Sequence, residues 1–541
     1  FEKLILTTEK PYIKGGTFGL SGTTVASVGG FGCSIDSIRI LLNNQQPELD
    51  VTATINFMDK TDFGFSASTT ARVIAKMNNP APVTNAENTG PPQKISWSFD
   101  RVAINEIGLD IQTQPYRLKG GIAYKENDPV YGRGFFGGLL FELRARPAPF
   151  NISVNAGFGS TPTLRYWYAD GIVSSTIPLG SIAEIKRLMG GMYYHMKPTT
   201  GFSSLAGALS RNTKNATTPV NYAPDANAGY GFRAGVTFSS VKSEKVFNGD
   251  VLLTVNINNN GGLSNVALDG NVVSLSTISE RQSKPVGDQK IYGSMHMEYD
   301  NANQSFHAIM QANINVPGMI NGSGLALIHF EPNVWYVCIG RPSNSLNVRI
   351  LDFAAVRAYF MMGHNLEPMP PPPPLVTGIV NNYGIGSTRN INSLQSANGL
   401  ALGVNFTTGL SGRFGNDNIN VNYLLYAVVG FDVMATDYGT KAKCSNTNSE
   451  LGINGWYSQG QAYLGLQGNL RVHAELNIGN WDPSMDVDIL SFSAAALLQA
   501  QAPKPTHFNG AVGLQVSALG LELGPYSIPF SYGTQCGTVI N

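Results

Sequence analysis

Three histidines of this chain stand at spacings that could bring their imidazoles together. They are His296, His307 and His329, within residues 246–340, where apolar and polar residues alternate between turn-like Asn, Gly and Pro. A hairpin turn at the sequence DNAN would place His296 opposite His307, and a turn centred on Gly318 would place His307 opposite His329. Such cross-strand partners lie about 5 Å apart at Cβ. The three histidines are therefore a candidate transition-metal site.

Solvated or hydrogen-bonded histidines on the polar side of a sheet are the alternative, and the pattern favours it. A straight row across three strands does not converge on a tetrahedral metal. A slip of one residue would also turn a whole strand's side chains to the other face. Glu298 would share the face of His296, but turn and strand-edge roles also explain it. We therefore expect no cofactor.

Other motifs of catalysis have weaker support. Gly132, Gly134 and Gly137 fit the spacing G-x-G-x-x-G, but the residues that follow, LLFELRAR, alternate like a strand instead of opening a helix. The sequence contains no GxSxG, HExxH, Walker A or EF-hand motif. An enzyme is accordingly the less expected class, and we name no catalytic residue.

Tyr166, Trp167 and Tyr168 form an aromatic run that could stack on sugar rings or on a partner protein. Every second residue of a strand points inward, so core packing is the expected role for at least half of such rings. The run is a candidate ligand-binding site, with glycans as possible ligands.

The four cysteines are Cys33, Cys338, Cys444 and Cys536, and none forms a CxxC pair. Cys444 and Cys536 both lie in polar, loop-like sequence near the end of the chain, which predicts a disulfide between them. Cys338 lies in an apolar strand, where a buried free thiol is expected. Cys33 fits either state.

The elements that would position these residues are mostly strands. Short alternating runs separated by turn residues predict an all-β fold of large antiparallel sheets, meander- or sandwich-like, with one or two short helices. The best helix candidate in the first half is 181–189, where Ser181 and Glu184 stand at capping-box spacing and three apolar residues share a helical face.

Five consecutive prolines, 370–374, are the clearest signal of a domain boundary in the sequence. They favour an extended spacer, and a ligand for an SH3-like partner is the less expected alternative. We predict an N-terminal β region at 1–115, a central β-meander domain at 116–367, a linker at 368–376 and a C-terminal β domain at 377–541.

The composition of the chain limits the classes of partner and the cellular locations that we expect. The 541 residues include 36 basic and 36 acidic side chains, only 13% of the chain, so no positive field would attract nucleic acid. No run of apolar residues is long enough for a transmembrane helix. The chain opens without a basic-then-apolar leader, which we interpret as a signal removed or lying outside this sequence, and the chain as a possible segment of a larger precursor.

Several stretches carry a resemblance to a known group. LGINGWYSQGQAYLGLQG, SAAALLQAQAP, LRYWYADG, GGMYYHMKP and NVWYVCIGRPSNSLNVRI look similar to parts of the large, uncharacterised secreted β-rich surface proteins of type IX-secreting bacteria. The resemblance touches much of residues 120–541 and implies a secreted or cell-surface location. It implies no activity and no catalytic residues.

From the sequence we expect a non-enzymatic structural or interaction protein of the cell surface or exterior, a segment of a larger assembly with other subunits or copies of itself as partners. The first alternative is a carbohydrate-binding or carbohydrate-active secreted β protein. The second alternative is an outer-membrane β-barrel, which needs strands of about 10 residues with a lipid-facing apolar side and aromatic girdles.

Overall fold

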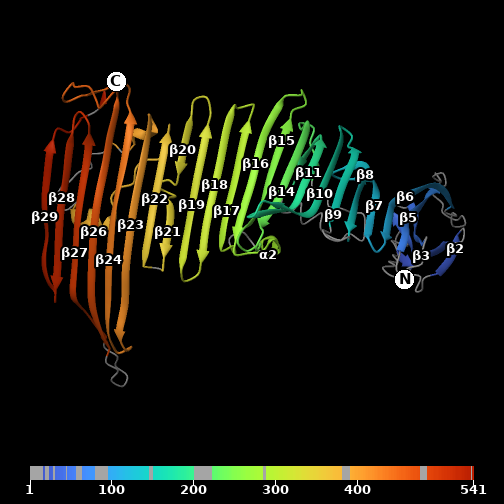
Figure 1. Ribbon diagram of the computed structural model, residues 1–541, viewed down its shortest axis with the longest axis horizontal. Coiled ribbons are helices and arrows are strands. Elements are labelled where there is room, and N and C mark those ends of the chain that lie inside the picture. Colours follow the sequence, from blue (N-terminus) through green and yellow to red (C-terminus); the bar gives the residue numbers. More distant parts are fainter. Residues whose placement is uncertain are drawn as a thin grey trace, which may run out of the picture. The chain divides into compact units, whose positions relative to one another are not determined.

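The structure is a computed structural model that describes residues 16–18, 24–28, 31–43, 46–56, 64–78, 96–144, 150–199, 222–283, 288–351, 353–380, 390, 392–475, 484–537 and 539–540. It divides into two compact units, Phe1–Val266 and Ala267–Asn541. Both consist almost wholly of antiparallel strands (Figure 1). The all-β prediction is confirmed.

The strands of the first unit are β1 (Gly16–Phe18), β2 (Thr24–Val28), β3 (Phe31–Asn43), β4 (Gln46–Asn56), β5 (Gly64–Asn78), β6 (Ser96–Gln112), β7 (Tyr116–Asp128), β8 (Gly132–Leu143), β9 (Phe150–Ser160), β10 (Arg165–Leu179), β11 (Ala183–Tyr194), β12 (Met196–Pro198), β13 (Tyr222–Pro224), β14 (Tyr230–Ser240) and β15 (Asn248–Ile257). From β3 to β11 each strand pairs with the next along the chain, and β11, β14 and β15 continue the series. Successive strands can pair in this meander, because antiparallel partners need no long crossover.

The division between the units falls within β16 (Leu263–Ser274). The later strands are β17 (Ile291–Asp300), β18 (Ser305–Val316), β19 (Ile320–Phe330), β20 (Trp335–Ile339), β21 (Leu346–Ile350), β22 (Ala354–Gly363), β23 (Asn398–Gly415), β24 (Ile419–Asp437), β25 (Lys443–Cys444), β26 (Trp456–Glu475), β27 (Ser484–Ala502), β28 (His507–Ala518), β29 (Leu521–Gly533) and β30 (Val539–Ile540). The helical segments are α2 (Ile278–Ser283), α3 (Pro374–Val380) and the 3-10 turn η3 (Ser393–Gln395).

The second unit is also a meander, from β17 through β19, β22, β23, β24, β26, β27 and β28 to β29. The short strands β20 and β21 together occupy one strand position of this meander, because each pairs with β19 on one side and with β22 on the other. The strands β23, β24, β26 and β27 extend well beyond β22 and β28 (Figure 1).

The prediction of a helix at 181–189 is wrong. Residues 181–182 lie in the turn between β10 and β11, and the remaining residues lie in β11. The pairing of β11 with β14 shifts between Ile185 and Arg187, so Lys186 is the extra residue of a β-bulge. A bulge interrupts the period of two, and the apolar residues on its two sides then fall at a spacing that resembles a helical face.

The prolines 370–374 do not separate two compact units, so the boundary predicted there is corrected. β22 precedes them and β23 follows them, and these two strands pair directly. Leu366 and Met369 are buried against the sheet, and α3 begins at the last proline. We call residues 364–380 the strap: it packs on one face of β22–β28 within the second unit. Its residues before α3 have no regular secondary structure, and they are anchored to the sheet by Leu366 and Met369.

The predicted disulfide is present, and it joins Cys444 to Cys536 across 92 positions of sequence. It lies beside the short β25–β30 pair and a small cluster that includes Leu451 and Tyr457. Cys338 is a buried free thiol, as expected. The side chain of Cys33 lies outside the described residues.

Candidate functional site: an exposed apolar face

The histidine row is only partly as predicted. His307 faces His329 between β18 and β19, with ring centroids 5.6 Å apart. His296 faces Ile309 instead, and His307 faces Glu298. The turn holds four residues between Asp300 and Ser305, so the register of this hairpin is shifted by two from the predicted one.

Carboxylates contact two of these imidazoles, those of His296 and His329, each at a separate place. His296 Nδ1 lies 2.7 Å from Asp269 Oδ1, and His329 Nε2 lies 3.2 Å from Glu331 Oε1. The His329 ring also stacks on Tyr336. In the described part of the chain, no three His, Cys, Asp or Glu side chains converge as metal ligands. The metal site predicted at His296, His307 and His329 therefore has no geometric support.

The aromatic run of β10 splits between the two faces of its sheet. Tyr166 and Tyr168 are 2% and 3% exposed and pack with Phe136, Tyr193 and Tyr222. Trp167 points to the opposite face, where its ring contacts Tyr230 edge-on. Tyr166 and Tyr168 therefore cannot bind a ligand together with Trp167, and their burial agrees with the expectation that at least half of these rings pack inward, because adjacent residues of a strand point to opposite sides.

The face that holds Tyr166 and Tyr168 is the polar face of the first unit. Buried charge lies on it: Asp170 is 3% exposed and accepts a 2.6 Å hydrogen bond from the hydroxyl of Tyr222. Farther along, the hydroxyl of Thr237 donates to Asp250 at 2.8 Å. Buried polar groups of this kind are stable only when they are hydrogen-bonded.

The second unit has an equivalent polar face, partly covered by the strap. Asp432 is 3% exposed and accepts hydrogen bonds from Tyr359 at 2.8 Å and from Gln461 at 2.7 Å. Gln461 also donates to the carbonyl of Pro370, at 3.3 Å, so the strap is tied to the same network.

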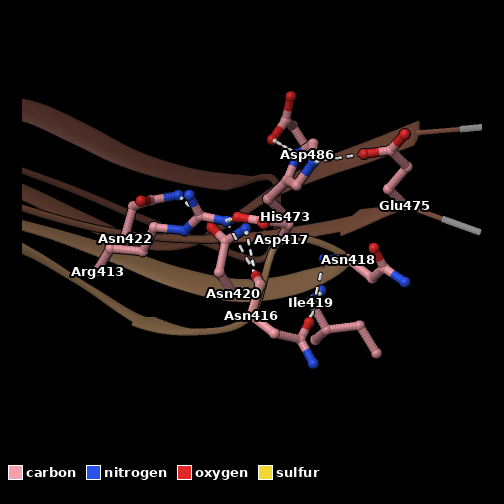
Figure 2. A network of polar contacts seen from close by, with 10 residues as sticks. All are labelled: Arg413, Asn416, Asp417, Asn418, Ile419, Asn420, Asn422, His473, Glu475 and Asp486. Atoms are coloured by element: carbon pink, nitrogen blue, oxygen red, sulfur yellow. Dashed lines mark hydrogen bonds and ion pairs between the residues drawn. The ribbon is translucent and has the colours of Figure 1, made fainter.

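Toward the other end of the long strands, the polar face carries ion pairs (Figure 2). Arg413 lies 3.0 Å from Asp417, and His473 Nδ1 lies 2.9 Å from Asp486. Asn416 caps the connecting turn by accepting from the backbone N–H of Ile419 at 2.8 Å. All these groups find partners within the sheet, so Figure 2 shows a polar surface that is internally satisfied.

The opposite face of the first unit is apolar and exposed, and we call it the first apolar face. One row of aromatic rings crosses six strands in direct register: Tyr124, Phe135, Phe158, Trp167, Tyr194 and Tyr230. Rings of three neighbouring pairs lie close together, with centroids 4.8 Å apart for Tyr124 and Phe135, 5.3 Å for Phe135 and Phe158, and 4.5 Å for Tyr194 and Tyr230. The rows beyond it hold residues such as Ile122, Gly137, Ala156, Ala169, Met192 and Phe232.

The second unit repeats the arrangement on what we call the second apolar face. Tyr299, Phe306, Phe330 and Trp335 form a row in register across β17–β20. From β17 to β22, every regular position on this face is Gly, Ala, Val, Leu, Ile, Met or an aromatic residue. Over β23–β29 the face continues with side chains such as Phe431, Leu464 and Val512, which are 42%, 43% and 53% exposed.

The first apolar face and the β17–β22 part of the second have a similar height along the strands, whereas on the longer β24 the apolar positions run from Ile419 to Ala435. On β7 the apolar positions run from Tyr124 to Tyr116, and on β17 they run from Tyr299 to Ile291, nine residues in each case. Nine residues of antiparallel strand extend about 27 Å. A large exposed apolar surface is unusual for a protein surrounded by water, and it marks a surface that normally contacts something apolar.

Sequence reasoning recognised the alternation but not which of the two faces is exposed. A signal was present: the apolar positions of adjacent strands are almost free of charge, whereas the alternate positions hold Asp, Arg, Gln and Asn. A sheet buried by its own fold would show the charges outside and the apolar residues inside.

Comparison of the chain with protein-family models, with curated proteins and with solved structures finds no match. None of the helices in the described ranges has the length and apolar character needed to cross a membrane.

Proposed function

We propose that this protein is a non-enzymatic membrane protein whose antiparallel sheets lie in a lipid bilayer, with the apolar faces against the acyl chains. The observation that supports this proposal most directly is the register of the aromatic row above an uncharged apolar band. Trp and Tyr prefer the interface between hydrocarbon and water, because one side of the ring is apolar and the other end is polar.

On β7 and on β17 the dimensions agree with a bilayer, whereas the apolar positions of the longer β24 exceed it. A strand that crosses the hydrocarbon needs about 9–11 residues, and the apolar positions of β7 and β17 span nine. The apolar band of membrane strands is about 25 Å tall, close to the height of the apolar positions on β7 and β17. Acyl chains are flexible and also fill uneven surfaces, such as the 580 Å³ hollow beside Phe431, Ala462 and Leu498.

The polar faces support the same proposal. In hydrocarbon every backbone group must be paired within the sheet, and charged side chains must turn away from lipid. Asp170 and Asp432 both lie on the faces opposite the apolar ones, with hydrogen-bond donors around them. The carbohydrate alternative loses its support, because Tyr166 and Tyr168 are buried.

Two adjacent residues of β28 provide a matched test. Leu514 points to the second apolar face and is 48% exposed, whereas Gln515 points to the polar face. In Leu514→Arg the new charge would enter hydrocarbon, at a cost of about 2–4 kcal/mol near the midplane. Gln515→Arg adds the same charge on the other side and should have little effect.

The measurement is incorporation of the full chain into phosphatidylcholine vesicles, scored by flotation after an alkaline carbonate wash. Wild type and Gln515→Arg should float with the vesicles, and Leu514→Arg should be largely lost from them. If wild type stays out of the vesicles and light scattering without detergent shows a defined oligomer that Leu514→Arg dissociates, the apolar face is a contact between copies and the proposal fails.

A further inference from the structure

Two arginines interrupt the apolar character of the first apolar face, both at its aromatic end. Arg133 and Arg165 are the charged residues among the regular positions of this face on the described strands β8–β11, β14 and β15. Each lies two residues beyond a ring of the aromatic row, Phe135 and Trp167 respectively. Both arginine side chains are exposed.

The sheet brings the two arginines to one place. Ser160 of β9 is in register with Arg133 of β8 on one side and with Arg165 of β10 on the other. Two strand spacings separate the arginines, so their Cα atoms lie about 10 Å apart. The three residues point to the same side, and the guanidinium groups can therefore reach one small ligand between them.

No ion pair among the described residues neutralises these two arginines: Glu126, in the irregular stretch of β7 opposite Arg133, is paired with Arg101 at 3.0 Å. No carboxylate of the described chain forms an ion pair with either guanidinium group, and Arg133 Nε donates only a long 3.4 Å hydrogen bond to the Ser160 hydroxyl. This contrasts with the polar faces, where Arg72 and Arg471 are each held by aspartate. The strand positions therefore present two unmatched cations and one hydroxyl, next to the aromatic row.

We propose that Arg133, Ser160 and Arg165 bind the phosphate of an anionic lipid headgroup, an inference that rests on the proposed function. Arginine matches phosphate geometrically, because its planar fork donates two parallel hydrogen bonds. The aromatic row lies at the level where headgroups meet acyl chains, so a lipid whose chains lie on the apolar band carries its phosphate to the arginines. The headgroup supplies the negative charge that the sheet lacks there.

The test is binding of dioctanoyl phosphatidic acid to the full chain in a neutral maltoside detergent, followed by calorimetry. Two further ligands separate the possible sources of binding: dioctanoylglycerol has the chains without the phosphate, and inorganic phosphate has the anion without the chains. We expect saturable binding of phosphatidic acid only. The double variant Arg133→Gln/Arg165→Gln should raise the dissociation constant for phosphatidic acid at least tenfold. The dissociation constant of the conservative variant Arg133→Lys/Arg165→Lys should lie between those of the wild type and the Gln variant.

A matched control removes two cations elsewhere. Arg349 and Arg357 are exposed on the polar face of the second unit, and Arg349→Gln/Arg357→Gln should leave the affinity for phosphatidic acid unchanged. Equal affinity in the Arg133→Gln/Arg165→Gln variant, or equal binding of inorganic phosphate or of dioctanoylglycerol, would overturn the headgroup site.

Vesicle incorporation, measured in parallel, distinguishes the two proposals. Normal incorporation, together with phosphatidic acid binding that does not depend on Arg133 and Arg165, would overturn the headgroup site and leave the membrane proposal intact. Failure of wild type to incorporate would overturn the membrane proposal itself.

Discussion

Glycines on the polar faces leave room for aromatic rings from the neighbouring strand. Tyr193 faces Gly231 across the β11–β14 pair, and a Cβ added to Gly231 would overlap the Tyr193 ring. The ring is held there by its hydroxyl, which donates to Asn256 at 2.7 Å. The identity of a single residue thus fixes how a large side chain lies on the sheet, and this contact is testable.

We predict that Gly231→Val destabilises the protein by about 1–3 kcal/mol, because overpacking displaces the Tyr193 ring. Gly190 of β11 is the control, since a Cβ there meets no atom within 4 Å and points to the apolar face. Gly190→Val should be neutral. Thermal unfolding in detergent, followed by circular dichroism, checks both variants, and an equal loss in the two would refute the close-contact explanation.

At the scale of the element, a disulfide ties together two connections at the end of the second unit. The disulfide joins the connection between β24 and β26 to the segment after β29, beside the two-residue β25–β30 pair. Pairs this short contribute few hydrogen bonds. The covalent link therefore adds to the buried cluster around Leu451 and to the hydrogen bonds of Asn446 in restraining this part of the second unit.

We predict that Cys444→Ser/Cys536→Ser lowers the free energy of unfolding by about 2–4 kcal/mol, since a long loop in the unfolded chain is no longer closed. Hydrogen exchange should rise first in β25 and β30. Cys338→Ala is the control for loss of a thiol outside the disulfide and should leave exchange in β25 and β30 unchanged. Peptide mapping without reduction should yield one peptide pair joined through Cys444 and Cys536, and its absence would contradict the structure.

At the scale of the whole molecule, both units have the same distribution of polar and apolar residues over the two faces of their sheets. Each has one face with buried polar networks and one exposed apolar face with an aromatic row. In both units the apolar residues are exposed and the polar residues are buried. One apolar environment shared by both units explains this pattern more simply than two unrelated partners do. This leads to a prediction about depth in the bilayer.

We predict that Trp167 and Trp335 both lie near the headgroups, because each belongs to an aromatic row. In variants that keep only one of these tryptophans, with the others changed to Phe, fluorescence should be quenched more by lipids brominated near the ester groups than by lipids brominated near the chain ends. Stronger quenching from the chain ends, or none from either lipid, would argue against the proposed orientation.

The strands were predictable from the sequence because their cause is local. Alternation of apolar and polar residues with turn residues between them appears in any stretch such as 246–340, and the structure has strands β15–β20 there. The pairing of Cys444 with Cys536 was predictable for a similar reason, because both stand in polar connections near the chain end. Where alternation was interrupted, as at the bulged Lys186, local reasoning failed and predicted a helix.

Register, packing and exposure were decided only by the tertiary structure. His296 faces Ile309 because a four-residue turn sets the pairing of β17 with β18. The positions of the histidines in the sequence do not determine the length of that turn. The prolines 370–374 belong to an anchored strap because Leu366 and Met369 find a surface on strands that come from both sides of them in the chain. The sequence determined that each strand has an apolar side; only the assembled sheets, by burying charge on one face, left that apolar side exposed.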